Sequence, residues 1–176
     1  MNAVTDEVLG PVLLGYDGSD AARGAIASAG RVFRGREAVV VTVWESVGSA
    51  ILRNLPSGAT ELGRDARGIA EDVVDELDAA SAEGAEALAA EGAALATTAG
   101  FAARPVARRA VARATERKAV TVWRAILDAA EEEAAELIVL GSRGRSPVTS
   151  MVLGSVSYGV VNNSDRPVLI IPPGRG

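Results

Sequence analysis

Hydrophobic and polar positions alternate along the chain with two periods, one typical of buried strands and one of amphipathic helices. Four short apolar runs predict strands, at residues 12–14, 38–44, 134–140 and 167–171, and residues 101–111 are a further, arginine-containing strand region. Four stretches with apolar residues three or four positions apart predict helices, at residues 20–33, 62–98, 120–133 and 156–162. This alternation predicts an α/β fold with a parallel sheet, helices on both of its faces and right-handed crossovers.

The second apolar run is the clearest strand. Val39 to Val43 form a nearly continuous β-branched series, which is typical of a strand covered on both faces. Residues 45–58 then follow neither period and contain Gly48, Pro56 and Gly58, so we expect a long loop there. The chain has no convincing internal repeat and no domain boundary. We therefore predict a single domain with one open five-stranded sheet.

A glycine-punctuated stretch, residues 141–155, joins the fourth predicted strand to the last predicted helix. Gly141 and Gly144 are separated by two residues, and nine more residues lead to Gly154, which Ser155 follows directly. Glycines allow the backbone to approach a ligand closely, and a helix N-terminus offers free N–H donors and partial positive charge. The stretch therefore predicts an anion site, against the alternative of ordinary turn glycines in a glycine-rich chain.

This spacing resembles the nucleotide-binding signature of the universal stress protein family, G-x2-G-x9-G-[S/T]. Residues 12–20, an apolar strand followed by Asp-Gly-Ser, resemble the opening of the same family. The resemblance implies a Rossmann-like sheet in the order 3-2-1-4-5, of the adenine nucleotide alpha hydrolase type. It covers roughly residues 11–172, although residues 46–120 carry it only by pattern. We expect a universal stress protein domain at residues 10–173, preceded by a flexible N-terminal arm at residues 1–9.

With that strand order, the ends of strands one and four meet where the connections reverse direction, and ligands of open parallel sheets bind at such a point. There Asp17 is a candidate for the ribose or, weakly, for a magnesium ion, although aspartate also caps turns of this kind. Val43 is a candidate wall for adenine, and the hydroxyls of Ser155 and Ser157 suit the phosphates. The full set of expected nucleotide contacts is Tyr16, Asp17, Val43, Leu140, Gly141, Arg143, Gly144, Gly154, Ser155, Val156 and Ser157.

Composition narrows the chemistry further. The 176 residues include no cysteine and no histidine, which excludes disulfides, thiolate nucleophiles and Ser-His-Asp triads. The Walker sequence G-x4-G-K-[S/T] is absent, and the one lysine, Lys118, is remote from the glycine loop. Family members often carry histidines near positions 42 and 163, where this chain has Thr42 and Asn163. We therefore expect nucleotide binding with slow or no intrinsic hydrolysis.

Charge is unevenly distributed. Ten acidic residues lie between Glu61 and Glu91, against two arginines, and we interpret them as a solvated helix face, with an acidic docking surface as the alternative. Residues 104–124 are rich in arginine. We interpret this segment as a charge-protected edge strand and not as a nucleic-acid patch, because no aromatic residues interleave with the arginines. The net charge of −5 also makes nucleic acid an unexpected partner.

The leading hypothesis is an ATP-binding, stress-response regulatory protein, with Mg²⁺ as a possible companion of the nucleotide. The alternatives are a slow ATPase, or an interaction module that binds cyclic AMP or no nucleotide. A PP-loop adenylating enzyme fits poorly, because the turn after the first strand lacks the Ser-Gly-Gly-x-Asp-Ser loop. The chain has neither a membrane-spanning apolar run nor an N-terminal signal, so we expect a cytoplasmic protein. The apolar last strand, Val168–Ile171, at a sheet edge predicts a homodimer.

Overall fold

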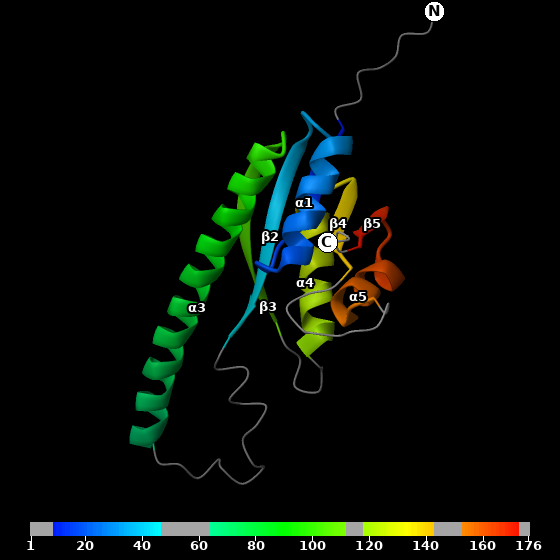
Figure 1. The fold of residues 1–176 in the computed structure, drawn as a ribbon. Helices are drawn as coiled ribbons and strands as arrows, with labels where there is room; N and C mark the ends of the chain where they lie inside the picture. Colours follow the sequence, from blue (N-terminus) through cyan, green and yellow to red (C-terminus); the bar gives the residue numbers. More distant parts are fainter. Residues whose placement is uncertain (1–8, 47–63, 112–117, 143–152, 173–176) are drawn as a thin grey trace, which may run out of the picture.

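The computed structural model describes residues 9–46, 64–111, 118–142 and 153–172 (Figure 1). Strands and helices alternate along these residues, as the sequence predicts. Their bounds are β1 (Val12–Gly15), α1 (Asp20–Val32), β2 (Glu37–Glu45), α3 (Arg64–Thr98), β3 (Ala102–Ala110), α4 (Lys118–Glu132), β4 (Leu137–Gly141), α5 (Ser155–Asn163) and β5 (Val168–Ile171).

The five strands form one parallel sheet in the order β3-β2-β1-β4-β5, which confirms the order that the family resemblance implies. β1 lies at the centre, where Val12 is opposite Ala38 of β2 on one side and Leu137 of β4 on the other. β2 and β3 pair along nine residues, whereas β1 pairs with β2 only as far as Gly15 and Val41. β2 and β3 therefore continue beyond the carboxyl end of β1.

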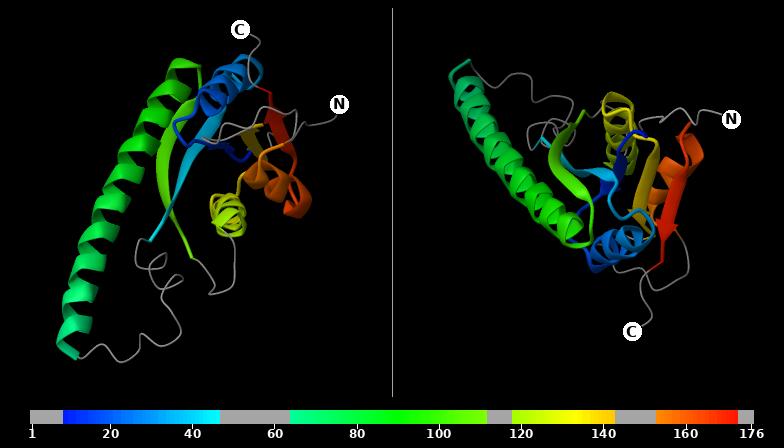
Figure 2. Two further views of the ribbon diagram at one scale, coloured as in Figure 1. Left: turned by 60° about the horizontal axis from the view of Figure 1, so that its bottom comes forward. Right: turned by 90° about the horizontal axis from the view of Figure 1, so that it is seen from above.

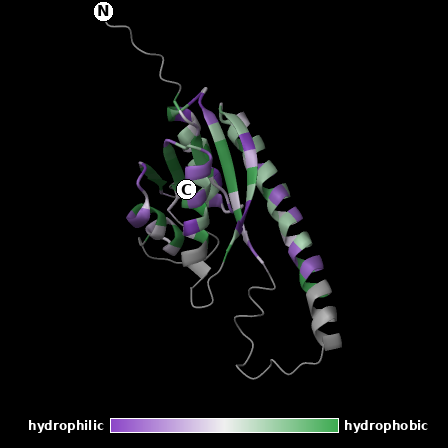
Figure 3. Ribbon diagram, turned by 180° about the vertical axis from the view of Figure 1, so that it is seen from behind, coloured by the Kyte–Doolittle hydropathy of each residue, from purple (hydrophilic) through white to green (hydrophobic). Residues whose placement is uncertain are grey.

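Helices cover both faces of the sheet, α1 and α3 on one side and α4 and α5 on the other (Figure 2). Successive β1 side chains point to opposite faces. Leu14 accordingly packs with Ile26 of α1, and Leu13 packs with Ile126 of α4. The central strands are mainly apolar along their length, whereas α3 alternates between polar and apolar residues (Figure 3). The continuous apolar runs of β1, β2 and β4 are explained by this burial on both faces.

One predicted boundary is wrong. The sequence places the fourth strand at residues 134–140, but β4 begins at Leu137. The preceding residues end α4 in a Schellman turn, in which the Ala135 N–H donates to the Ala130 carbonyl at 2.9 Å and Ala134 has a φ of +49°. Glycine normally occupies that left-handed position, so the alanine gave no signal that the helix ends there.

A second difference concerns the loop expected at residues 45–58. Glu45 is the last residue of β2, opposite Ala110 of β3, so the strand continues one residue further than predicted. Residues 47–58 of that loop lie outside the described residues. Residues 1–8 of the predicted arm and residues 112–117, between β3 and α4, also lie outside the described residues.

Candidate functional site

The carboxyl ends of β1 and β4 lie side by side, at the point where the connections of the sheet reverse direction. β1 and β4 are neighbours, with Leu14 opposite Val139. A Cβ atom placed on Gly141 would lie 2.9 Å from the backbone carbon and oxygen of Ala21, in the first turn of α1. The end of β4 therefore touches the start of α1, and only glycine permits so close an approach. We call the carboxyl ends of β1 and β4, with the starts of α1 and α5, the switch point.

The turn after β1 is fixed by its own hydrogen bonds. The Oδ1 atom of Asp17 accepts from the Ser19 N–H at 3.0 Å, and Ser19 Oγ caps α1 by accepting from the Ala22 N–H at 3.2 Å. Gly18 between them has a φ of +78°, which favours glycine. The structure thus gives Asp17 the turn-capping role that the sequence analysis weighed against a ribose or metal role.

Tyr16 enters this turn with its backbone held on both sides. Its N–H donates to the Val41 carbonyl at 2.9 Å, which is the last contact between the main chains of β1 and β2. Its carbonyl accepts from the buried hydroxyl of Thr42 at 3.0 Å. The Thr42 hydroxyl thus takes the place of a backbone N–H of β2 as the donor to the Tyr16 carbonyl. β1 can therefore turn away from the sheet while β2 continues. The sequence analysis assigned no role to Thr42, and this hydrogen bond gives it one.

The Tyr16 side chain points away from the switch point, into the layer between the sheet and α3. Its ring is 3% exposed and packs against Gly92, and its hydroxyl donates to Glu91 Oε1 at 2.6 Å. Burial, followed by the hydrogen bond to Glu91, raises the pKa of Tyr16 to about 12. Hydrogen bonds from Tyr16 and Arg23 in turn lower the pKa of Glu91. Only the backbone of Tyr16 remains near the predicted ligand.

On the other side of the switch point, hydrogen bonds connect the two described ends of the glycine loop. The Gly154 N–H donates to the Ser142 carbonyl at 2.8 Å, and the Ser142 N–H donates to the Ile171 carbonyl at 2.8 Å. Leu140 is buried against Gly15 of β1, and it is a packing residue in this structure. Two expected phosphate contacts, Arg143 and Gly144, lie outside the described residues.

The start of α5 retains the features of an anion site, with one change of role. Gly154 is the N-cap and provides no side-chain cap, so the first-turn N–H groups have no partner within the helix. Ser155 is exposed and Val156 is half-buried. Ser157 is buried, and its hydroxyl donates to the Gly141 carbonyl at 2.8 Å. That hydroxyl therefore attaches α5 to β4, whereas the sequence analysis assigned it to a phosphate.

Val43 lies two residues beyond the last pairing of β1 with β2. It is half-buried and packs on the face that carries α4 and α5, as Val41 does. This position provides an apolar surface beyond the end of β1, as the adenine-wall prediction requires. Across the described residues, no cluster of three or more acidic side chains is placed to hold a metal ion.

The arginines of β3 are paired with carboxylates on both faces of the sheet. Arg104 and Arg108 pair with neighbouring glutamates near the end of α4, Glu133 and Glu132. Arg109 pairs with Asp78 of α3 at 3.0 Å and lies over the ring of Trp44. β3 is an edge strand of the described sheet, as the charge-protected interpretation assumes, but its arginines pair with carboxylates on the faces of the sheet.

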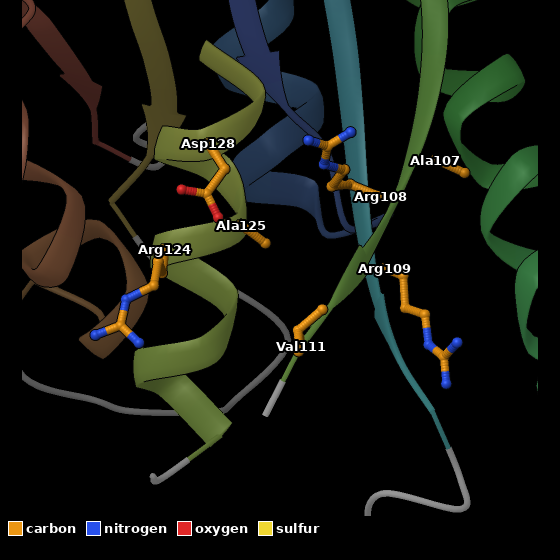
Figure 4. A pocket seen from close by; sticks show the side chains of 7 residues that line it. All are labelled: Ala107, Arg108, Arg109, Val111, Arg124, Ala125 and Asp128. Atoms are coloured by element: carbon orange, nitrogen blue, oxygen red, sulfur yellow. The ribbon is translucent and has the colours of Figure 1, made fainter. Parts of the chain in front are cut away.

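A groove of about 450 Å³ lies between the carboxyl end of β3 and α4 (Figure 4). Arg109 and Arg124 line it but point in different directions, and Asp128 adds a carboxylate to its wall. Because the cations do not converge on one position, the groove lacks the geometry of an anion site. In the part of the chain that the structure describes, no helix is long and apolar enough to cross a membrane.

Sequence reasoning missed two partners of Tyr16, Glu91 and Arg23. Arg23 Nη1 lies 2.6 Å from Glu91 Oε1, and its guanidinium carbon is 5.8 Å from the centre of the Tyr16 ring. A buried tyrosine needs a partner for its hydroxyl, so the tyrosine itself was a usable signal. Nothing in the sequence distinguishes Glu91 from the other acidic residues of its helix.

Comparison with known proteins identifies the family to which this sequence belongs. The model of the universal stress protein family matches residues 9–172. Over 46 residues, 26% of this chain, the sequence is 37% identical to universal stress protein MJ0577 of Methanocaldococcus jannaschii and 52% identical to universal stress protein YxiE of Bacillus subtilis. These matches span only 28% and 31% of the two relatives.

Solved structures resemble the whole fold. The structure of the MJ0577 protein aligns with a TM-score of 0.69 and 18% identity, covering 96% of this chain and 99% of that one. A universal stress protein in complex with cAMP aligns with a TM-score of 0.57 and 23% identity, over 95% and 99%. One from Archaeoglobus fulgidus in complex with dAMP gives 0.52 and 20%, over 93% and 98%. At these identities, the likeness establishes the fold.

Proposed function

Because the chain belongs to the universal stress protein family, we propose that it binds an adenine nucleotide, ATP, at the switch point between β1 and β4. One observation carries the proposal: Gly141, at the end of β4, packs against Ala21 in the first turn of α1, so the end of β4 is adjacent to the segment that follows β1. The cAMP and dAMP complexes of similarly folded proteins support the ligand class. We further propose a single domain at residues 10–173, a cytoplasmic location and a regulatory role in stress.

The proposed contacts divide between backbone and side chains. Phosphates interact with the first-turn N–H groups of α5 and with the exposed Ser155 hydroxyl, since a helix N-terminus attracts anions. Asp17 uses its remaining lone pairs for a ribose hydroxyl or a nucleotide-bound Mg²⁺, while Oδ1 keeps its bond to the Ser19 N–H. Val43 provides an apolar surface for adenine. Ser157 contributes by holding α5 on β4.

Calorimetric titration of ATP in the presence of Mg²⁺ tests the proposal. Gly141→Ala forces the end of β4 away from α1, and we expect affinity to fall about tenfold because misplaced binding groups lose their hydrogen bonds. Gly84→Ala is the matched control, since a Cβ atom there meets nothing within 4 Å. Absence of ATP binding by the unmodified protein would contradict the proposal.

We propose that the bound nucleotide is held and not turned over. The chain has no histidine to activate water and no Walker lysine, and its one lysine is the first residue of α4. Phosphate release should therefore stay below one turnover per protein over the time of a binding experiment. Sustained multiple turnover that Asp17→Ala abolishes would instead establish the alternative, a slow ATPase.

Cyclic AMP is the second candidate ligand, because one similarly folded protein is in complex with it. Mass spectrometry of the nucleotide that copurifies with the protein, followed by melting shifts with ATP, AMP and cyclic AMP, separates the two. We expect the largest shift with ATP, whose three phosphates engage the α5 N-terminus. A larger melting shift with cyclic AMP than with ATP would identify cyclic AMP as the preferred ligand.

We also propose a homodimer that pairs the outer edges of two β5 strands. β5 is an edge of the described sheet, and Val168–Ile171 are all half-buried apolar residues. An apolar edge strand with unpaired backbone groups favours pairing with another chain. Sedimentation at micromolar concentration should give the mass of two chains, and a monomer under those conditions would contradict the dimer.

A further inference from the structure

A cluster of three side chains from three elements lies behind the turn that follows β1. Glu91 Oε1, from α3, accepts the Tyr16 hydroxyl at 2.6 Å and lies 2.6 Å from Arg23 Nη1 of α1. Arg23 also lies over the Tyr16 ring. One carboxylate oxygen thus joins the first residue after β1 to both helices on that face of the sheet.

Tyr16 is too tightly packed to move independently of this cluster. A Cβ atom on Gly92 would lie 2.7 Å from the Tyr16 ring, so the ring already fills the space that a larger residue would need. Its backbone N–H and carbonyl are bonded to Val41 and Thr42. A shift of the ring therefore moves the peptide that connects it to Asp17.

The same part of α3 touches the turn a second time. A Cβ atom on Gly18 would lie 3.2 Å from a methyl carbon of Leu88, one helical turn before Glu91. Gly18 separates Asp17 from the N-cap of α1, Ser19. Residues 88–92 of α3 thus support the turn from below at both of its ends, although they lie more than 70 residues away in the sequence.

We propose that Glu91 is a positioning residue for nucleotide binding, which fixes the turn carrying Asp17 through Tyr16 and Arg23. It acts through these partners and not by touching the nucleotide. This inference rests on the proposed function, because it assumes that the switch point holds the ligand. Without Glu91, the buried Tyr16 hydroxyl has no acceptor and Arg23 loses its ion pair, so the turn is no longer held in one position.

Variants of Glu91 separate positioning from general stability. Glu91→Ala removes both interactions, and we expect ATP to bind about tenfold more weakly. Glu91→Gln keeps an amide oxygen that can accept from Tyr16, so it should recover most of that loss. Glu133→Ala is the control, because it removes the carboxylate that pairs with Arg104 on the far edge of the sheet. Its melting temperature should fall while its affinity for ATP stays unchanged.

A measurement without nucleotide tests the positioning directly. The Ser19 amide donates to Asp17 Oδ1, so its hydrogen exchange reports how firmly the turn is held. Exchange should be faster in Glu91→Ala than in the unmodified protein, and unchanged in Glu133→Ala. If Glu91→Ala does not fold, Tyr16→Phe provides the same comparison, since it removes the hydroxyl and keeps the ring.

The outcomes distinguish the two proposals. Full ATP affinity and unchanged Ser19 exchange in Glu91→Ala would overturn the positioning role and leave nucleotide binding intact. An equal loss of affinity in Glu133→Ala would also overturn it, because the effect would then be one of stability alone. If the unmodified protein binds no ATP, nucleotide binding itself is wrong, and the role of Glu91 in it is wrong as well.

Discussion

Raising the pH should destabilise the fold through a single buried hydroxyl, that of Tyr16. In the neutral state this hydroxyl donates a 2.6 Å hydrogen bond to Glu91. Ionisation removes the proton that makes this bond and places a phenolate beside the Glu91 carboxylate. Burial, reinforced by the bond to Glu91 and by its charge, therefore raises the pKa of Tyr16 from 10.0 to about 12.

The direction of the effect follows from proton linkage. The folded state keeps the Tyr16 proton up to about pH 12, whereas the unfolded chain releases it near the ordinary value of 10.0. The stability due to this shift is fully present below pH 10 and is lost progressively as the pH rises towards 12. Each unit of pKa corresponds to about 1.4 kcal/mol, so two units give a total loss of about 3 kcal/mol.

Urea unfolding as a function of pH measures this loss. The chain has two tyrosines, and the other, Tyr158, is 61% exposed, so the experiment uses a Tyr158→Phe background. In that background we compare Tyr16 with Tyr16→Phe, which keeps the ring but cannot ionise.

The difference in the free energy of unfolding between the two proteins should be constant below pH 10. Above pH 10 the protein that contains Tyr16 should lose about 1.4 kcal/mol of unfolding free energy per pH unit relative to Tyr16→Phe. The tyrosinate absorbance of the folded protein should rise only near pH 12. A difference that stays constant up to pH 11, or tyrosinate formation centred near pH 10, would refute the assignment of Tyr16 to a buried hydrogen bond.

Three substitutions test the backbone after α4 and the packing of α5 by thermal or urea unfolding. Ala134→Gly should stabilise the protein by about 0.5–1 kcal/mol, because glycine adopts the φ of +49° without strain; a loss of stability would contradict that assignment. Gly159→Ala should destabilise by about 1–3 kcal/mol, since its Cβ would overlap the Trp123 ring, and an unchanged melting temperature would mean that α5 can shift on α4. Ser157→Ala should cost about 1–2 kcal/mol by leaving the buried Gly141 carbonyl without its donor, whereas a phosphate-binding hydroxyl would lower ATP affinity and not stability.

Local signals in the sequence were sufficient to predict the alternation of strands and helices, whereas the strand order was an implication of the family resemblance. The β-branched series from Val39 to Val43 lies in β2, whose residues up to Thr42 are buried on both faces, because a continuous apolar run has no polar side to expose. The turn at Gly18 was also predictable, since a left-handed residue there requires glycine. The start of β4 was not, because Ala134 adopts a left-handed conformation without the usual glycine.

The positions of the candidate site were predictable, but the directions of its side chains were not. The sequence predicts that the end of β4 at Gly141 lies near the turn at Asp17, and in the structure Gly141 lies against Ala21, four residues after Asp17. The ring of Tyr16 and the hydroxyl of Ser157, however, are oriented by partners distant in the sequence, Glu91 and the Gly141 carbonyl. No local pattern records such partners.

The arginine-rich strand illustrates the same limit for charge. In the sequence, residues 104–109 contain three arginines and no acid, and read alone they describe a basic patch. In the fold, Arg104, Arg108 and Arg109 each meet a carboxylate that lies 24 to 31 residues away. Because β3 has α4 on one face and α3 on the other, the acidic residues of both helices are available to it. The excess of one sign along the sequence is therefore balanced in space.

The small buried residues of α3 determine where the Tyr16 ring, and with it the turn at Asp17, is held. Its buried face consists of alanine and glycine, at Ala85, Ala89, Gly92, Ala93 and Ala96, so the helix lies close to the sheet. Such small side chains bury little apolar area per residue, and they form a smooth surface with few ridges and hollows for the sheet to pack against. Where Gly92 meets the sheet, the Tyr16 ring occupies the space, and its hydroxyl reaches Glu91 on the next residue of the helix. The aromatic-poor core thus places one of its few aromatic rings where β1 ends, and this placement connects the turn at Asp17 to α3.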